Sequence, residues 1–180
     1  MTPGYENLRE RAKGLEEENF RFRAFLKHHI GLPSKEVDGL VFASAEKVWT
    51  RIDCTACANC CRELTPEFTE KDVARLAAHL GMNESEFTSK YLTRAKSRNE
   101  SQPVMRELPC PFLKDNLCSV YEHRPTACRG YPYLDKSDVI SRTLSMIGRT
   151  AECPAVFEVW EELKKATGFR RRARSSHSTE

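Results

Sequence analysis

A run of four cysteines at residues 54–61 constrains this chain more than any other feature of its sequence. The run reads C-x2-C-x2-C-C within IDCTACANCC. Four further cysteines follow, and the eight are Cys54, Cys57, Cys60, Cys61, Cys110, Cys118, Cys128 and Cys153. Two residues between cysteines let both thiolates point toward one centre, as in zinc knuckles and iron–sulfur loops. So many thiols close together without a cation would repel one another or oxidise, so the pattern predicts metal binding.

Eight cysteines would also suit a disulfide framework in a secreted protein. The first twenty residues, MTPGYENLRERAKGLEEENF, lack the apolar stretch of a secretory signal and carry acidic side chains throughout. No apolar run approaches the ~18 residues that span a membrane. We therefore expect a cytoplasmic protein without membrane contact, in which reduced thiols are available to bind metal.

The identity and number of the metals stay open at this level. Eight thiolates fill two four-coordinate zinc sites, or hold one or two iron–sulfur clusters. The first three cysteines match the start of the bacterial ferredoxin run, but Cys61 breaks the spacing of its fourth ligand. Three nearly contiguous ligands favour iron–sulfur slightly over zinc. Adjacent Cys60 and Cys61 tend to point apart, so we expect them to serve different metals unless one is a spare thiol.

The charge of the chain gives little support for nucleic-acid binding. The 29 lysines and arginines against 26 acidic residues give a net charge of +3. Residues 168–180 hold four arginines and one glutamate, so this tail accounts for the whole excess. Two expected helices around Leu80-Gly81-Met82 loosely resemble a helix-turn-helix. Glu84 and Glu86 in the second helix would repel phosphate, so a nucleic-acid binder with a structural metal is kept only as an alternative.

The N-terminal region, residues 5–30, has the periodicity of a helix. Apolar or small residues step by four and three along one seam, which consists of Leu8, Ala12, Leu15, Asn19, Phe22 and Leu26. The seam favours a helix packed on its own domain. A short coiled-coil dimer arm, with Asn19 setting the register, is the alternative.

The rest of the chain reads as short helices between loops. Residues 31–46 read as a linker, 52–61 as a loop wrapped on a ligand, and 122–134 as a compact loop. Thr69 to Leu80 reads as a helix with a Thr69–Asp72 capping box, and Asn83 caps the next helix. Further helices are expected over residues 139–149 and from Pro154 onward. Strands at 104–108 and 117–121 are expected around the turn at 114–116.

These elements predict a mainly α protein: a small helical domain with irregular cysteine-rich metal-binding loops and one short β-hairpin. We expect an N-terminal helix and linker over residues 1–46, a cysteine-cluster metal-binding domain over 47–167, and a disordered basic tail over 168–180.

Four segments resemble a known family. They are IDCTACANCC at 52–61, PCPFL at 109–113, CSVYEHRPTACRGYP at 118–132 and CPAVFEVWEELK at 153–164. They are similar to the YkgJ-type cysteine-cluster proteins, also described as the CxxCxxCC zinc- or iron-chelating domain. All eight cysteines fall on the family pattern, as do Arg124, Pro125 and Arg129. The resemblance implies a metal site with iron–sulfur or zinc as cofactor, and it implies no settled reaction.

Two arginines of this motif are candidate cofactor-binding residues. Arg124 and Arg129 flank Cys128, and their positive charge would offset the negative charge of a thiolate-bound cluster. A surface arginine in a turn is the alternative for Arg124. His123 is the one histidine between two cysteines, and a polar loop residue is the favoured interpretation of it over a ligand or proton carrier.

Three classes of function follow from these residues. The first is a metal-binding module with a structural or electron-transfer site. The second is a redox or methyl-transfer-associated enzyme, since flagellin lysine methylases resemble the family through a similar cysteine cluster. The third is the nucleic-acid binder already described. Common catalytic motifs such as GxGxxG and HExxH are absent from the sequence, so no reaction is assigned. An unknown protein partner remains open.

Overall fold

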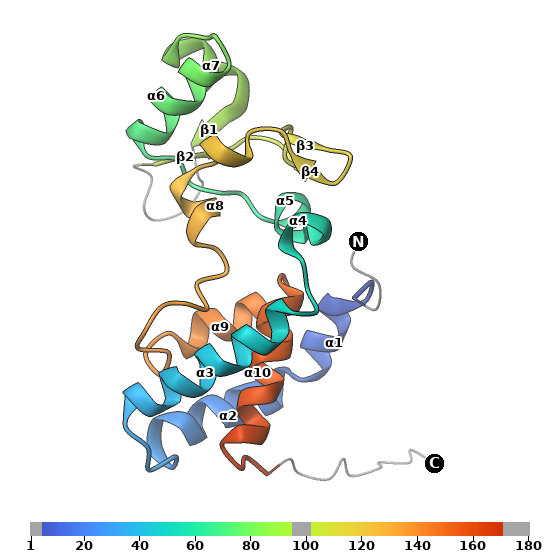
Figure 1. The fold of residues 1–180 in the computed structure, drawn as a ribbon, viewed down its shortest axis with the longest axis vertical. Helices are drawn as coiled ribbons and strands as arrows, with labels where there is room; N and C mark the ends of the chain where they lie inside the picture. The colour runs from blue at the N-terminus through green and yellow to red at the C-terminus, as the bar shows by residue number, and fades with distance from the viewer. Residues whose placement is uncertain (1–4, 95–101, 171–180) are drawn as a thin grey trace. The chain divides into compact units, whose positions relative to one another are not determined.

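The chain forms two compact units in a computed structural model that describes residues 5–94 and 102–170. The cysteine unit contains the described residues of 5–7 and 49–134, and the helical unit contains those of 8–48 and 135–170. Figure 1 shows that both units are built largely from helices. The predicted mainly helical class is therefore confirmed. The domain ranges expected from the sequence stay a prediction, because a compact unit need not fold on its own.

The helical unit is a set of packed helices. They are α1 (Leu8–Gly14), α2 (Glu16–His28), α3 (Ser34–Trp49), α9 (Thr143–Thr150) and α10 (Pro154–Ala166). The last residue of α3, Trp49, is counted with the cysteine unit. Helix α9 packs against α10, α2 and α1. Pro154 occupies the first turn of α10, as predicted, where its missing N–H costs no hydrogen bond. Within the described residues, no helix has both the length and the apolar character needed to cross a membrane.

The predicted N-terminal seam is buried inside this unit. Leu8, Ala12, Asn19, Phe22 and Leu26 are all buried, although the helix divides into α1 and α2 at Leu15. The Trp160 Nε1–H donates to the Asn19 Oδ1 at 3.0 Å, and the Phe22 ring meets Trp160 edge-on. The seam thus packs against its own chain. A dimer through this helix stays a prediction.

The expected linker at residues 31–46 is wrong, because most of it is helix α3. Val37, Val41 and Val48 are buried at helical spacing, and this burial outweighs the weak helix propensity of Gly39. The Asp38 carboxylate accepts hydrogen bonds from the amides of residues 138 and 139 at 2.8 and 2.9 Å. These bonds hold residue 139 outside a helix, so the helix expected from 139 begins only at Thr143.

The cysteine unit contains short elements around a small apolar core. Its elements are α4 (Cys54–Cys57), α5 (Asn59–Glu63), α6 (Glu70–His79), α7 (Glu84–Tyr91), β1 (Leu92–Arg94), β2 (Pro103–Met105), β3 (Leu113–Lys114), β4 (Leu117–Cys118), the 3₁₀ turn η1 (Tyr121–His123) and α8 (Thr126–Gly130). The core includes Phe68, Leu76, Phe87, Phe112 and Val120. The predicted Thr69–Asp72 capping box of α6 and the predicted cap of α7 at Asn83 are confirmed, and Asn83 forms a capping box with Glu86.

The strand pairing differs from the prediction. Residues 104 and 105 belong to β2, which pairs antiparallel with β1 in the register Leu92↔Met105. The hairpin at the expected turn is formed by β3 and β4, with Leu113 opposite Cys118. Asp115 and Asn116 both have positive φ, and such a two-residue turn joins the strands immediately beside it. The turn therefore selects Leu113–Lys114 rather than residues 104–108 as the partner strand.

A buried ion pair in the helical unit gives a test of its packing. Lys164 is 1% exposed, and its Nζ lies 2.7 Å from carboxylate oxygens of both Glu18 and Glu161. Replacing it by methionine leaves two largely buried carboxylates without their cation. We expect Lys164→Met to lower the free energy of unfolding by about 3 kcal/mol, measured by urea denaturation.

Lys165 provides the matched control, since it pairs with Glu162 at 2.9 Å but is exposed. Lys165→Met should cost less than about 0.5 kcal/mol. Equal losses for the two variants would contradict the assigned packing of Lys164.

Candidate metal centre

The cysteine run forms two short helical turns, so the prediction of an irregular loop is wrong here. Cys54 and Cys57 lie in α4, and Cys60 and Cys61 lie in α5. Asp53 caps α4, because its carboxylate accepts from the Thr55 amide at 2.8 Å. Ala58, at φ 49°, adopts the left-handed conformation and separates the two turns. Local capping thus gives regular structure to a segment whose composition suggested none.

Hydrogen bonds join this run to the segment that carries Cys110 and Cys118. The Cys110 amide donates to the Cys61 carbonyl at 2.7 Å. Arg62 donates to the Cys57 carbonyl at 3.0 Å and to the Asn116 side chain, whose own amide donates to the Ala56 carbonyl. The turn of the β3–β4 hairpin is therefore bonded to α4 and α5. Cys110 and Cys118, at the two ends of this hairpin region, also pack against the apolar core of the unit.

Four thiols lie close enough for their charges to interact, and we call Cys61, Cys110, Cys118 and Cys128 the four-thiol set. Burial raises the pKa of Cys110 to about 11 and the pKa of Cys128 to about 12, and it raises the pKa of Cys118 as well. The charge of Cys61 raises all three pKa values further. The four thiols come from three separate segments of the chain. At neutral pH, Cys110, Cys118 and Cys128 are protonated.

Cys61 is the acidic member of the set. A hydrogen bond from the Cys60 thiol, opposed by burial and assisted by the charge of Arg62, lowers the pKa of Cys61 to about 7. The prediction that Cys60 and Cys61 point apart is therefore wrong, because their sulfur atoms share this bond.

Cys54, Cys57 and Cys153 are set apart from this group. Cys54 and Cys57 interact with each other on α4, where burial, followed by the charges of Cys57 and Asp53, raises the pKa of Cys54 to about 11. Cys153 is buried at the start of α10 and belongs to the helical unit. The structure thus places seven of the eight cysteines in the cysteine unit and brings four of them into one set.

The donors of the four-thiol set fit a thiophilic metal. Backbone amides of Phe112 and Leu113 bond to the Cys110 thiolate, and the Val120 amide bonds to the Cys118 thiolate. Such N–H···S bonds stabilise coordinated thiolates. In the described part of the chain, no three His, Cys, Asp or Glu side chains are already arranged to hold a metal ion.

The two predicted cofactor-binding arginines have different surroundings. Arg124 lies over the Tyr121 ring, with its guanidinium carbon 3.8 Å from the ring centroid. Its charge opposes the rise in pKa of both Cys118 and Cys128, so it favours their thiolates. Arg129 donates to the carbonyls of Arg124 and Glu122, so it organises the backbone that carries Arg124.

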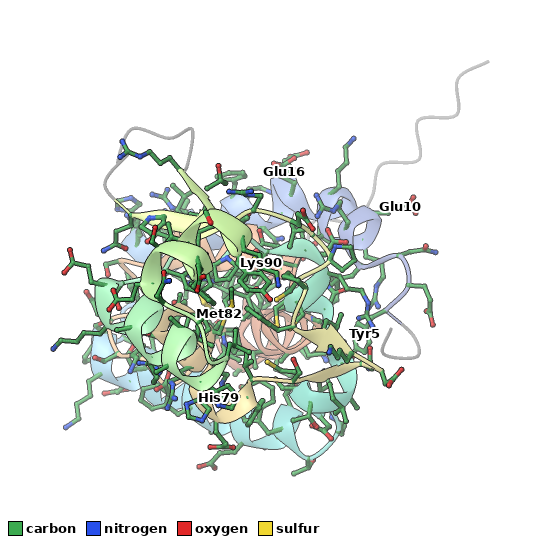
Figure 2. All side chains as sticks on the ribbon, turned by 90° about the horizontal axis from the view of Figure 1, so that it is seen from above. Tyr5, Glu10, Glu16, His79, Met82 and Lys90 are labelled. Atoms are coloured by element: carbon green, nitrogen blue, oxygen red, sulfur yellow. The ribbon has the colours of Figure 1, made fainter. Side chains whose placement is uncertain are left out.

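The segment at 122–134 contains η1 and α8 and is therefore more regular than the predicted loop. His123, in η1, stacks on the imidazole ring of His79 with centroids 3.9 Å apart. Figure 2 shows His79 near the end of α6 and Met82 in the turn that follows. His123 thus contacts a helix of the core.

Sequence reasoning missed the residues that anchor this segment to α6. The Asp72 carboxylate accepts hydrogen bonds from the amide and hydroxyl of Thr126 at 3.1 and 2.9 Å. Arg75 donates to the carbonyls of His123 and Arg124 at 3.3 and 3.1 Å. The Thr69–Asp72 spacing predicted a local cap, but nothing in the sequence marks the contacts with residues fifty positions away.

The helical scaffold and grouped thiols define a small metal-chelating protein of the cysteine-cluster type. The model of the CxxCxxCC family, described as "Putative zinc- or iron-chelating domain", matches residues 53–153, which is more than half of the chain. The chain therefore belongs to this family, as its motifs predicted, and all eight cysteines fall within the match. No curated protein and no solved structure matches the chain significantly.

The buried carboxylate of Asp72 gives a test of this scaffold. Burial would raise its pKa, but hydrogen bonds from Thr69, Arg75 and Thr126 outweigh this and lower the pKa to about 2. Because the unfolded pKa is about 3.9, the ionised carboxylate stabilises the fold above pH 4. That stability is lost as the pH falls from about 4 to 2, and it amounts to about 2 kcal/mol.

Asp72→Asn should remove this part of the acid sensitivity, measured by urea unfolding of the metal-free protein between pH 5 and pH 2. Parallel pH profiles for the wild type and the variant would contradict the assignment.

Proposed function

We propose that this protein binds one iron–sulfur cluster through Cys61, Cys110, Cys118 and Cys128. The observation that carries the proposal is the grouping of thiols from three separate segments. The Cys110 amide donates to the Cys61 carbonyl at 2.7 Å, and Cys110 and Cys118 pack on the same apolar core. The charge of Cys61 also raises the pKa values of Cys110, Cys118 and Cys128. Thiols in a cytoplasmic protein are brought together at a cost in repulsion and desolvation, and a metal offsets that cost. The family, with its zinc- or iron-chelating character, supports the same reading.

Two features of the four-thiol set favour iron–sulfur over zinc. The Arg124 charge and the amide donors near Cys110 and Cys118 supply positive potential, which suits a cluster that gains an electron. Apolar Phe112 and Val120 border the sulfurs and limit solvent access. When bound, a cluster would supply one-electron transfer.

Zinc is the second candidate. Four thiolates complete a closed tetrahedral site without an open position for substrate. Such a site would stabilise the cysteine unit, whose strands have only two or three residues each. In that case the function would be structural, and recognition of a protein partner would take the place of electron transfer.

Cys54, Cys57 and Cys60 stay candidate ligands of a second metal. Cys153, in the helical unit, stays a candidate ligand from its place in the sequence motif. Arg129 acts on the site through the backbone of Arg124. A cytoplasmic location follows from the need to keep all eight cysteines reduced. The enzyme alternative has no assigned substrate. The nucleic-acid alternative is weakened by Glu84 and Glu86, which are both exposed on α7.

Purification without oxygen distinguishes the two metals. Iron matched by acid-labile sulfide, with broad visible absorption, would support the cluster. A colourless protein with zinc bound in place of iron would replace the first candidate by the second. Absence of both metals after reconstitution would contradict metal binding.

Serine variants test the ligand set. Cys110→Ser and Cys128→Ser each remove one donor of the set, and we expect metal content after anaerobic reconstitution to fall by at least about tenfold. Cys54→Ser is the matched control, because Cys54 interacts with Cys57 and Asp53 rather than with the set, so this variant should keep the metal of the four-thiol set and lose only the metal of a second site. Equal metal content in all three variants and the wild type would refute the assignment.

Metal binding should release protons in a number fixed by the thiols. Cys110, Cys118 and Cys128 have raised pKa values and are protonated at pH 7, whereas Cys61, with a pKa of about 7, is half ionised. Zn²⁺ binding by all four should therefore release between three and four protons, and affinity should increase with pH.

Calorimetric titration of the metal-free protein with Zn²⁺, in buffers of different ionisation enthalpy, measures this number. Release of one proton or none would mean that the four-thiol set does not bind the ion.

A further inference from the structure

One buried carboxylate caps two helices at once. The Asp72 Oδ2 accepts from the amide and hydroxyl of Thr69 at 3.1 and 2.8 Å, which completes the capping box of its own helix, α6. The Oδ1 accepts from the amide and hydroxyl of Thr126, which opens helix α8. Asp72 is 0% exposed, so the carboxylate that accepts both sets of bonds is buried, whereas Thr126 itself is exposed.

Helix α8 depends on this carboxylate for its cap. Its N-cap residue is Pro125, which makes no side-chain capping bond. Asp72 therefore supplies from α6 what a serine or aspartate normally supplies locally. Cys128 is the third residue of α8, so fixing the amide of Thr126 also fixes the start of the single turn that carries the Cys128 thiol.

Arg75 ties down the residues just before this turn. Its Nη2 lies 2.5 Å from the Asp72 Oδ1 and 3.1 Å from the Arg124 carbonyl oxygen, and its Nε donates to the His123 carbonyl at 3.3 Å. Arg129 donates to the same Arg124 carbonyl at 3.1 Å. Residues 123–126 are thus held to one face of α6 by charge-assisted hydrogen bonds, which are the stronger kind.

We propose that Asp72 and Arg75 form a positioning pair for the metal centre, holding the Arg124 charge and the Cys128 thiol where a bound metal needs them. The inference rests on the proposed function and deepens it, because it assigns the retention of metal to residues that do not touch the metal. Outer residues that orient ligands commonly change metal affinity by about 10- to 100-fold when mutated.

The second capping box of the unit shows what a purely local cap looks like. In α7, Asn83 and Glu86 exchange the same reciprocal bonds, at 2.9 and 3.0 Å, on an exposed surface. Asp72 makes the equivalent bonds in α6 but is buried and also reaches Thr126. Burial disfavours the charge of Asp72, and hydrogen bonds from Thr69, Arg75 and Thr126 stabilise it. An exposed helix cap needs no donor from a distant segment.

The test compares Asp72→Asn with Glu86→Gln, which make the same chemical change at the same position of two capping boxes. The first readout is the rate at which the reconstituted protein loses metal to an excess chelator, together with the visible or ultraviolet circular dichroism of the metal centre. The second readout needs no metal: the rate of iodoacetamide alkylation of Cys128 in the reduced metal-free protein, measured by peptide mass spectrometry relative to Cys54.

We expect Asp72→Asn to accelerate metal loss by at least about tenfold, to change the circular dichroism and to raise the relative alkylation rate of Cys128. Glu86→Gln should change none of these by more than about twofold. Thr126→Val removes one donor while keeping the shape and the amide, so it should show a smaller effect in the same direction, and Thr126→Ser should restore wild-type behaviour. These two variants decide the matter if Asp72→Asn does not fold.

Three other outcomes are informative. Equal effects of Asp72→Asn and Glu86→Gln would overturn the inference and reduce Asp72 to a helix cap. Unchanged Cys128 alkylation and metal loss in Asp72→Asn and Thr126→Val would overturn it as well. A wild type that takes up no metal, but in which Asp72→Asn selectively exposes Cys128, would refute the proposed metal binding while leaving the positioning pair in place.

Discussion

The cysteine unit depends on holding four thiols together although burial and mutual charge oppose their ionisation. Burial raises the pKa values of Cys110, Cys118 and Cys128, and the charge of Cys61 raises all three further. A metal cation reverses both effects, because it binds the ionised form and replaces lost hydration. The protein itself offsets part of this rise in pKa, because backbone amides donate to the sulfur atoms of Cys110 and Cys118 and the charge of Arg124 favours the Cys118 thiolate.

The surrounding structure follows from that requirement. The β3–β4 hairpin carries Cys118, packs on the apolar core and is bonded to the first cysteine run through Asn116 and Arg62. The segment with Arg124 and Cys128 is bonded to α6 through Asp72 and Arg75. Each segment that carries a proposed ligand is therefore attached to a regular element by hydrogen bonds that lie outside the thiol set.

The sequence predicted local features well and long-range ones poorly. The capping box at Thr69, the helix cap at Asn83 and the proline start of α10 depend on a few adjacent residues, and all are confirmed. Helix α3 was predicted as a linker because of its glycine and flanking proline, yet Asp38 anchors it to residues a hundred positions away. The cysteines identified the family and its metal chemistry. Their grouping, and the contacts of Asp72 and Arg75, depend on tertiary bonds that no spacing encodes.

Distances from the metal to its neighbours test the central claim most directly. X-ray absorption spectroscopy of the anaerobically purified protein, at the iron or zinc edge, reports which atoms surround the metal. We expect sulfur neighbours alone. Zinc would have four at about 2.3 Å, and iron would have thiolate and sulfide sulfur, with further iron atoms at a longer distance. The same coordination should persist in Cys54→Ser and be lost in Cys110→Ser. A first shell of nitrogen or oxygen, or one that Cys110→Ser leaves unchanged, would contradict the four-thiol centre.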